Sequence, residues 1–394
     1  MSTASSPLTP WRRTRRRSAE RRAAARLLVI CTRRDAALDA AVAQRLLDAA
    51  DASTIVDLAT FHRVAGLAYD RLRVLPSVSP VILEPLEAHF LANVVHHQQA
   101  LRDLARLQPI LDGIGVPWAV VRGPAAVELL YGAAGLRPYR DLDILVDPSG
   151  FADALTAIEG DGARVLDGNW KELRREMRGE IHLALPSGDA LDLHWNLIMT
   201  NGGARRGATA AVLGRAVRID LGGFRVPTLD DADRAIHLAA HAALSGGDRL
   251  GWLKDLERSA TVTPPDWDVL VDRVRLWNVA RPTGLLLSRA ELVLGADVPA
   301  LTIRQLLGAR TTRVVRAIDR RWPPERASGR PTPTRIVAGV IGHGLAGGTA
   351  LSIHRGLGRL WSRAEIPAAS RRNAGEADRS AFLRAVSTGR DSAQ

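Results

Sequence analysis

Cysteine is almost absent from this chain of 394 residues, which has only Cys31. A single cysteine excludes an internal disulfide bond and is compatible with a reducing compartment. Long apolar runs are absent too, because no stretch approaches the ~20 consecutive apolar residues that a membrane-spanning helix needs. Residues 27–31, behind the N-terminal arginines, form an apolar run too short for a secretory signal. These absences predict a cytoplasmic protein with no membrane span.

Lysine is nearly missing as well, with only Lys171 and Lys254, so arginine carries most of the positive charge behind the net +12. The excess lies at the two ends. Residues 1–26 carry +7 (eight arginines, one glutamate) and residues 323–394 carry +6 (eleven arginines, five acids), which leaves −1 for the middle. The ends are either solvated tails or arms that attract phosphate-rich or acidic partners. No groove with interleaved aromatic residues is evident, so we do not expect a nucleic-acid partner.

Apolar periodicity and composition divide the chain into five segments. Spacings of three and four residues indicate helices, alternation indicates strands, and low apolar content with Arg, Ser, Gly and Pro indicates disorder. The expected segments are a disordered basic arm (1–24), an N-terminal helical region (25–112), a catalytic domain (113–229), a C-terminal helical region (230–322) and a basic, largely flexible tail (323–394). Asp230 or Asp231 is a plausible N-cap. The tail holds one weak amphipathic stretch, residues 351–361, and no clear core.

Two carboxylates stand at the start of a short apolar run. Asp141 and Asp143 flank Leu142, and three further apolar residues complete the run at Val146. Strand side chains alternate between faces, so both carboxylates point the same way. Like charges held this close repel each other unless a cation lies between them. The pattern predicts a strand that binds a divalent metal ion.

A third carboxylate follows on a predicted hairpin over residues 180–195. Asp192 and His194 share one face of its second strand, opposite three apolar side chains. Burying an acid there is costly unless it is paired or bound to metal. Three carboxylates on neighbouring strands would suit two Mg²⁺ ions ~4 Å apart, the arrangement used for phosphoryl transfer. Asp189 is the rival third acid, but it lies in the turn, where aspartate is common for structural reasons.

A possible phosphate-binding turn precedes the acidic strand. A short strand ending at Val121 runs through Arg122, Gly123 and Pro124 into a helix. Glycine permits close approach of the backbone, proline suits the first helical position, and a helix N-terminus offers free N–H groups to an anion. Such turns are common in purely structural roles. Its place 18 residues before Asp141 favours the functional interpretation.

Together these features resemble the nucleotidyltransferases of the DNA-polymerase-β-like superfamily, specifically the bacterial group of uncharacterised nucleotidyltransferases. The similarity covers roughly residues 25–260, and its helical flanks match less specifically. The matching motifs are Arg122-Gly123 with Ala125-Ala126, Leu129-Leu130-Tyr131, Gly135-Leu136-Arg137, the strand 141–146, and Leu191-Asp192-Leu193-His194-Trp195. The resemblance implies an α+β protein with a small mixed-sheet, polymerase-β-like domain between two helical regions.

The resemblance also implies roles for individual residues. Asp141 and Asp143 would bind the metal ions that hold a nucleoside triphosphate, and Asp192 would bind the second ion and help to deprotonate the acceptor. The metal would be Mg²⁺, or Mn²⁺ in its place. The nucleotide-binding residues would be Arg122, Gly123, Arg137 and Lys254.

Some of these residues have a second interpretation. Arg137 could instead pair with a site carboxylate, Lys254 could be a surface residue, and His194 could support Asp192 or face the acceptor. Arg122 stands where the group usually has lysine, which changes the geometry of the charge. Pro124 removes one N–H donor and predicts weaker or differently shaped triphosphate binding.

The implied reaction is attack of an acceptor oxygen on the α-phosphate of a nucleoside triphosphate, with release of pyrophosphate. The acceptor would be a small molecule, a peptide or a protein. Three alternatives remain open: tailoring of a peptide, antibiotic or sugar on the same fold, a non-catalytic nucleotide- or partner-binding module, and a nucleic-acid binder acting through the arginine-rich ends.

Two further sets of side chains favour structural roles. His237 and His241 lie four residues apart, a spacing that can hold zinc, but no third ligand is obvious, and packed or capping histidines are favoured. The tryptophans at 118, 195 and 252 are interpreted as core residues.

Overall fold

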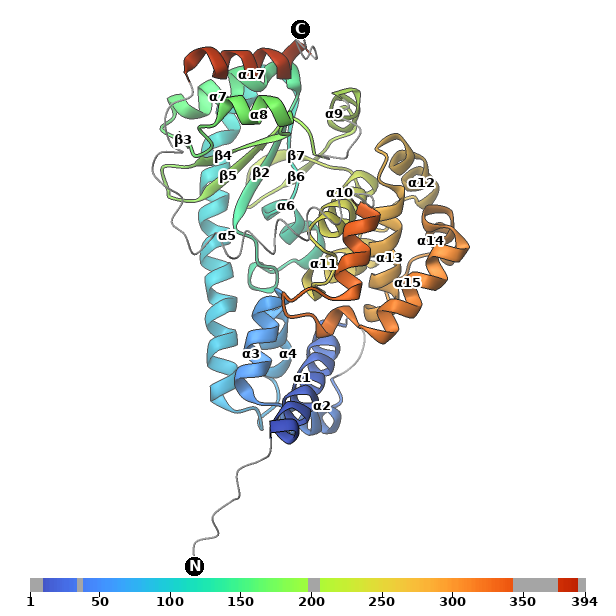
Figure 1. The fold of residues 1–394 in the computed structure, drawn as a ribbon. Helices are drawn as coiled ribbons and strands as arrows, with labels where there is room; N and C mark the ends of the chain where they lie inside the picture. The colour runs from blue at the N-terminus through green and yellow to red at the C-terminus, as the bar shows by residue number, and fades with distance from the viewer. Residues whose placement is uncertain (1–9, 34–37, 198–205, 343–374, 389–394) are drawn as a thin grey trace, which may run out of the picture.

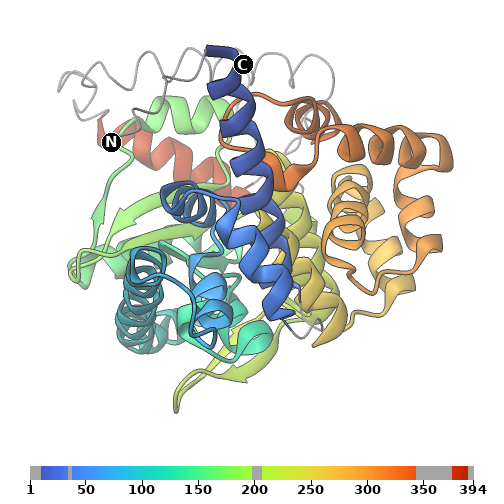
Figure 2. The same ribbon diagram turned by 90° about the horizontal axis from the view of Figure 1, so that it is seen from below.

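Five helices precede the first strand in the computed structural model, which describes residues 10–33, 38–197, 206–342 and 375–388. They are α1 (Pro10–Thr32), α2 (Ala40–Asp48), α3 (Ala52–Phe61), α4 (Ala65–Leu72) and α5 (Pro80–Ile114). Side chains of Asp39, Asp51 and Ser79 cap the N-termini of α2, α3 and α5. Viewed from below, α1 runs between the other N-terminal helices and the C-terminal helices (Figure 2).

The first helix begins earlier than the composition predicts. Helix α1 starts at Pro10, inside the segment 1–24 for which we expected disorder, whereas residues 1–9 lie outside the described part. Arginine and alanine both favour helix, so an arginine-rich composition does not prevent this conformation. The C-terminal half of α1 then buries Ala24, Leu27 and Leu28 completely, which anchors the helix on the core.

A seven-stranded mixed sheet occupies the middle of the chain, in the order β3-β4-β5-β2-β1-β7-β6. Its strands are β1 (Trp118–Val120), β2 (Asp141–Val146), β3 (Arg164–Val165), β4 (Glu180–Ala184), β5 (Ala190–His194), β6 (Val217–Asp220) and β7 (Arg225–Thr228). The predicted strand 141–146 and the predicted hairpin are confirmed as β2 and as the antiparallel pair β4–β5. Strand β5 runs parallel to β2, whereas β1 runs antiparallel to it.

Short helices connect these strands. They are α6 (Pro124–Ala126), which continues as one π-helical turn (Val127–Tyr131), a 3-10 turn (Ala134–Leu136), another (Pro148–Gly150), α7 (Phe151–Gly160), α8 (Trp170–Glu176) and α9 (Arg206–Leu213). The predicted helix after the glycine turn is therefore partly π-helical. It ends, as expected, at Gly132, whose φ of +68° is the left-handed conformation that glycine tolerates.

The two faces of the sheet have different neighbours. Leu142 and Ile144 of β2 pack with Leu104 and Leu107 of α5 and with residues of α7 in one apolar cluster. Leu145, on the opposite face, belongs to the cluster formed by the flanking helices. Because β2 alternates, Asp141 and Asp143 lie on the face of Leu145. The carboxylates are therefore directed toward the C-terminal helical region.

That region consists of α10 (Asp231–Leu244), α11 (Leu250–Thr261), α12 (Trp267–Leu276), α13 (Ala280–Leu294), α14 (Ala300–Leu307), α15 (Ala309–Arg321) and a 3-10 turn (Pro324–Arg326). Asp230 caps α10 through the N–H of Asp233, as one of the two predicted caps. In Figure 1 these helices lie to the right of the sheet and of the long helix α5.

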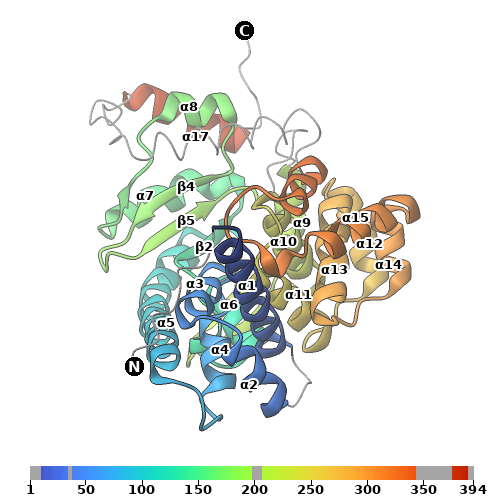
Figure 3. The ribbon, with the colours of Figure 1, turned by 60° about the horizontal axis from the view of Figure 1, so that its bottom comes forward.

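A final helix lies within the segment for which we expected a largely flexible tail. Helix α17 (Glu376–Thr388) packs against α7 and α8, at the side of the sheet away from α11 (Figure 3). Phe382 and Val386, four residues apart on its inner face, are completely buried, and the Phe382 ring lies 6.0 Å from that of Trp170. The large apolar residues of α17 are confined to positions 382–386, too short a run to produce a visible periodic pattern, which explains the difference. The predicted amphipathic stretch 351–361 lies outside the described residues.

None of the helices in the described part combines the length and apolar character that crossing a bilayer requires.

Candidate active site

The acidic strands bring two predicted carboxylates side by side. Asp143 of β2 and Asp192 of β5 are direct partners in the parallel register, so their side chains project from the same face. Ligand atoms of Asp143, Asp192 and His194 all lie within 4.8 Å of one another. Asp141 shares this face but lies outside that cluster. Asp189 lies in the turn, 3.6 Å from His96, and also lies outside it.

Asp143 is almost completely buried and already neutralised within the chain. Its Oδ1 accepts a hydrogen bond from the Arg122 guanidinium and lies 3.1 Å from His194 Nε2. Burial by itself would raise the pKa of Asp143, but Arg122 and His194 outweigh it and hold that pKa well below its usual range. The other ring nitrogen of His194 lies 3.3 Å from a carboxylate oxygen of Glu180, which orients the imidazole.

Asp192 has a histidine partner of its own. His182 Nδ1 lies 2.6 Å from Asp192 Oδ1, on the neighbouring strand β4. This hydrogen bond raises the pKa of His182 despite partial burial. The other nitrogen of His182 lies within 4 Å of Glu180 and Asp167, so the histidine is surrounded by acids. Nothing in the sequence pattern indicated this group.

Asp141 is the carboxylate with the fewest contacts. No side chain in the described ranges donates a hydrogen bond to it or forms an ion pair with it. Burial raises the pKa of Asp141, and the negative charges of Asp143 and Asp192 add to that effect. This repulsion is the kind that a bound cation relieves.

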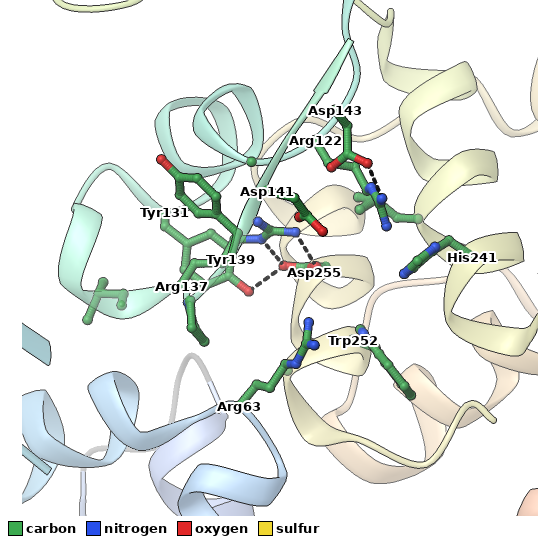
Figure 4. Close-up of a pocket in the computed structure, with 15 residues that line it drawn as sticks. Arg63, Arg122, Tyr131, Arg137, Tyr139, Asp141, Asp143, His241, Trp252 and Asp255 are labelled. Carbon is green, nitrogen blue, oxygen red and sulfur yellow. Dashed lines mark hydrogen bonds and ion pairs between the residues drawn. The ribbon is translucent and has the colours of Figure 1, made fainter. Parts of the chain in front are cut away.

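Asp141 and Asp143, but not Asp192, border a pocket that all three parts of the fold build (Figure 4). We call it the carboxylate pocket; it is lined by Arg63, Arg122, Gly123, Tyr131, Leu136, Arg137, Pro138, Tyr139, Asp141, Asp143, Leu238, His241, Gly251, Trp252 and Asp255. Arg63 comes from the α3–α4 turn, His241 from α10, and Trp252 from α11. The pocket therefore exists only when the sheet and both helical regions are assembled.

The turn before α6 requires its glycine. Gly123 has a φ of +53°, and a Cβ there would lie 3.3 Å from the carbonyl oxygen of Asp141 and 3.4 Å from the Tyr139 ring. The glycine therefore permits the backbone to pack closely against Asp141 and Tyr139, and its contact with a ligand stays a prediction.

Arg137 pairs with a carboxylate, which was one of its two predicted interpretations. Its Nε and one terminal nitrogen donate to the two oxygens of Asp255 on α11, at 2.8 and 3.0 Å. Tyr131 donates to the same carboxylate at 2.7 Å. Asp255 keeps the pKa of Arg137 above its usual value although burial alone would lower it. The bidentate pair joins the loop before β2 to the C-terminal helices.

With this geometry in place, comparison with family models finds one match, to the uncharacterised nucleotidyltransferase family, over residues 48–295. The match covers more than half of the chain and includes every residue of the carboxylate pocket. The chain belongs to this family. Neither a curated protein nor a solved structure matches it. The matched region begins later and ends later than the resemblance noted in the sequence, so it includes α12 and all of α13.

Membership of a nucleotidyltransferase family suggests a transferase that uses a divalent metal. The residues present fit such an ion: two carboxylates and an imidazole converge within 4.8 Å, and Asp141 adds an unpaired carboxylate on the same face. Carboxylate oxygens suit Mg²⁺ and Mn²⁺, and an imidazole ligand is better tolerated by Mn²⁺. Asp143, Asp192 and His194 therefore form a possible metal site.

Lys254 does not line the carboxylate pocket. It is 3% exposed, and its Nζ lies 2.7 Å from the buried carboxylate of Glu257 one helical turn away. The interpretation as a surface lysine is wrong, and the buried pair gives no support to the nucleotide contact that the family resemblance implied. Helix α11 directs this side chain into the core because its neighbours Leu253 and Leu256 are buried on both sides.

The two histidines of α10 differ from each other. His237 is 3% exposed, neither ring nitrogen has a hydrogen-bond partner among the described residues, and burial followed by the nearby Arg122 lowers its pKa to about 3. It is a packed histidine, as predicted. His241 lines the pocket, and burial together with Arg122 and His237 lowers its pKa well below the usual value. No third metal ligand joins them within the described ranges.

Several pocket residues were not predicted as site residues. Trp252 was interpreted as core, but it is half-buried and forms part of the pocket wall, whereas Trp118 and Trp195 are buried as expected. Arg63 adopts a φ of +58°, unusual for a residue other than glycine, which no sequence pattern reveals. Arg63 and Asp255 both lie in the helical flanks, where the resemblance to the family is less specific and assigned them no role.

Proposed function

We propose that this chain is a divalent-metal-dependent nucleotidyltransferase, built on a variant of the polymerase-β-like fold, that transfers a nucleoside monophosphate to an acceptor oxygen. The observation that carries the proposal is the pairing of Asp143 with Asp192 on parallel strands, with Asp141 on the same face at the pocket. Arg122 and His182 already offset the charges of Asp143 and Asp192, but Asp141 has no ion-pair partner among the described residues, and a divalent cation would relieve its repulsion with the other two.

The donor triphosphate would lie over the Gly123 turn. Gly123 and Arg122 both line the pocket at this turn. Two buried guanidinium nitrogens at the pocket, Arg122 Nε and Arg137 Nη1, have no hydrogen-bond partner among the described residues. Buried donors of this kind need a polar partner, and phosphate oxygens are suitable acceptors.

The metal ligands would be Asp143, Asp192 and His194, with Asp141 beside them. A bound Mg²⁺ or Mn²⁺ would neutralise the phosphate charge that develops during transfer. Asp143 must then exchange its contact with Arg122, which frees the guanidinium for the triphosphate. Glu180 would keep the imidazole of His194 oriented throughout.

In the transfer itself, the acceptor oxygen forms a bond to the α-phosphorus while the bond from that phosphorus to the β-phosphate oxygen breaks. Pyrophosphate leaves with the electron pair of that bond. The acceptor proton passes to Asp192, whose hydrogen-bonded partner His182 holds the carboxylate in place. The chain contributes mainly by positioning the reactants and compensating their charge.

The test uses nucleoside triphosphates labelled at the α-phosphorus, offered with Mg²⁺ or Mn²⁺ and candidate acceptors, and compares variants of the site. Asp143→Asn and Asp192→Asn should each reduce transfer by at least about 100-fold, the upper end of what loss of a metal ligand's supporting partner costs. Asp189→Asn is the matched control, because it removes an acid from the same hairpin but outside the site. Equal activity of Asp192→Asn and wild type would contradict the assignment.

A non-catalytic nucleotide-binding module is the second candidate, favoured by one observation: Arg122 already compensates Asp143. In that case a non-hydrolysable triphosphate analogue would bind equally well with and without divalent metal in calorimetry. The proposed enzyme requires binding that strengthens on addition of the metal and weakens in Asp143→Asn.

A further inference from the structure

A second pocket adjoins the carboxylate pocket on the side of the N-terminal helices. We call it the arginine pocket, because Arg63, Arg140 and Arg249 border it. Pro138 and Tyr139 separate the two pockets, and Arg63 borders both. The cavity volume is about 170 Å³, against about 50 Å³ for the carboxylate pocket. A water molecule occupies about 30 Å³ in the liquid, so there is room for a group of several heavy atoms.

The three arginines have no acidic partner in the described ranges. None of them forms an ion pair with a carboxylate there, although most buried or half-buried arginines of the chain do; Arg63 and Arg249 are half-buried, whereas Arg140 is exposed. Arg249 is held by aromatic rings instead, with its guanidinium carbon 5.0 Å from the centre of Phe61 and 5.2 Å from that of Trp252. Its buried Nε has no hydrogen-bond partner among the described residues. The Arg249 guanidinium is therefore held in position, and its Nε is available to donate a hydrogen bond.

The same charges repel one another. Burial lowers the pKa of Arg63 to about 10, and the positive charges of Arg249 and Arg140 add to this effect. Arg63 is held there by a left-handed backbone conformation and by the adjoining helix, because Gly251 N donates to the carbonyl oxygen of His62 at 2.9 Å. A protein keeps such an arrangement only if the surrounding structure enforces it.

The remaining polar groups of the wall are already positioned. His89 Nε2 lies 3.1 Å from Thr60 Oγ1, and Asn93 donates to the carbonyl oxygen of Gly135 at 3.0 Å. Among the residues that the structure describes, no carboxylate borders the arginine pocket. An anion placed there would therefore meet three cations and no negative side chain of the wall.

We propose that the arginine pocket binds a phosphate group of the acceptor, so that the acceptor is a phosphate-bearing molecule. Guanidinium groups match phosphate oxygens in geometry, and arginine retains its charge when partly buried. This inference rests on the proposed function, in which the triphosphate of the donor is held at the Gly123 turn. A phosphate in the arginine pocket would then belong to the second substrate, which reaches the carboxylates past Tyr139.

The test measures the binding of inorganic phosphate to the full-length protein by calorimetry. Arg140→Gln and Arg249→Gln should each weaken it about tenfold, as expected for loss of one charge-assisted contact. Arg275→Gln is the control, since it removes an exposed arginine of α12 that pairs only with the exposed Asp272. Unchanged circular dichroism and thermal unfolding would show that the variants are folded.

A second arm repeats the titration with a saturating non-hydrolysable triphosphate analogue and Mg²⁺. The proposal requires phosphate affinity to remain unchanged, because donor and acceptor occupy different pockets. Competition by the analogue, no phosphate binding, or equal affinity in wild type and the two variants would overturn it. Phosphate binding that depends on Arg140 and Arg249 in a protein that binds no nucleotide would contradict the proposed function but leave the phosphate pocket standing.

Discussion

The ion pair between Arg122 and Asp143 gives the site an internal counter-charge. Arg122 is the main influence that lowers the pKa of Asp143 against the effect of burial, so the carboxylate is ionised at all ordinary pH values. The guanidinium of Arg122 contacts the same carboxylate that a metal ion would bind. Stability and metal binding are thereby coupled at one residue.

We predict that Arg122→Met lowers the free energy of unfolding by about 3–5 kcal/mol in the absence of metal, because a buried carboxylate loses its partner. Mg²⁺ or Mn²⁺ should recover more stability in this variant than in wild type. Urea denaturation with and without the metal measures both effects. Arg175→Met, which breaks an exposed pair with Glu172, should change stability by less than about 1 kcal/mol. If the metal stabilises Arg122→Met and wild type equally, Arg122 and the metal do not compete for Asp143.

A pH effect at the residue scale comes from His237. Its pKa in the folded state is about 3, whereas an unfolded histidine titrates near ~6.5. The unfolded chain therefore binds the additional proton as pH falls below ~6.5, so this residue makes the protein less stable with falling pH down to about pH 3. Above pH ~6.5 the residue is neutral in both states, and this loss of stability is absent.

We predict that His237→Leu reduces the loss of stability between about pH 6.5 and 5 by at most ~1.4 kcal/mol per pH unit. The variant removes two unpartnered buried nitrogens as well, so it should not be strongly destabilised at neutral pH. Urea denaturation across this pH range provides the measurement. An unchanged dependence of the free energy of unfolding on pH would mean that His237 binds a proton as readily in the folded protein as in the unfolded chain.

At the scale of elements, the loop that carries Tyr139 depends on a close contact between two glycines. A Cβ at Gly66 of α4 would lie 1.9 Å from the carbonyl oxygen of Gly135, which is backbone and cannot move aside. We predict that Gly66→Ala destabilises the protein by about 1–3 kcal/mol. The same change at Gly113, in α5 with nothing within 4 Å, should stabilise it by up to about 1 kcal/mol.

The two variants are compared by urea denaturation and by binding of the triphosphate analogue. Because α4 sets the position of residues 134–136, Gly66→Ala should also weaken analogue binding, whereas Gly113→Ala should not. Similar behaviour of both variants would show that α4 can shift without disturbing the pocket.

At the scale of the whole molecule, the catalytic segment expected at 113–229 shares its core with helices outside it. Leu104 and Leu107 of α5 and Phe382 of α17 are fully buried against the sheet. The carboxylate face is completed by α10 and α11. The arginines that line both pockets come from the nearly neutral middle of the chain and not from its basic ends.

We predict that a fragment of residues 113–229 shows no cooperative urea transition, because its sheet would expose the face that α5 and α17 cover. The full-length chain should unfold cooperatively under the same conditions. Far-UV circular dichroism measured against urea concentration distinguishes the two. A cooperative transition in the fragment would show that residues 113–229 form an independently folding domain.

Local patterns were the predictable part of this fold. Alternation over 141–146 identified β2, turn residues identified the β4–β5 hairpin, and Gly123 marked the turn into α6. These features depend on neighbours within a few residues of the chain. The start of α1 and the whole of α17 were missed, because their order depends on a few side chains that reach a distant core.

Pairing between distant segments was the unpredictable part of the site. The sequence by itself determined that acidic residues lie on strands after a glycine turn, because strand and turn geometry follow from local side-chain chemistry, whereas the parallel register of β2 with β5 is a tertiary contact. Tertiary structure decided that Arg137 pairs with Asp255, that Lys254 turns into the core toward Glu257, and that Arg63 and Arg249 meet beside Tyr139. A charge acquires its partner only when helices remote in sequence pack together, and no local period encodes that contact.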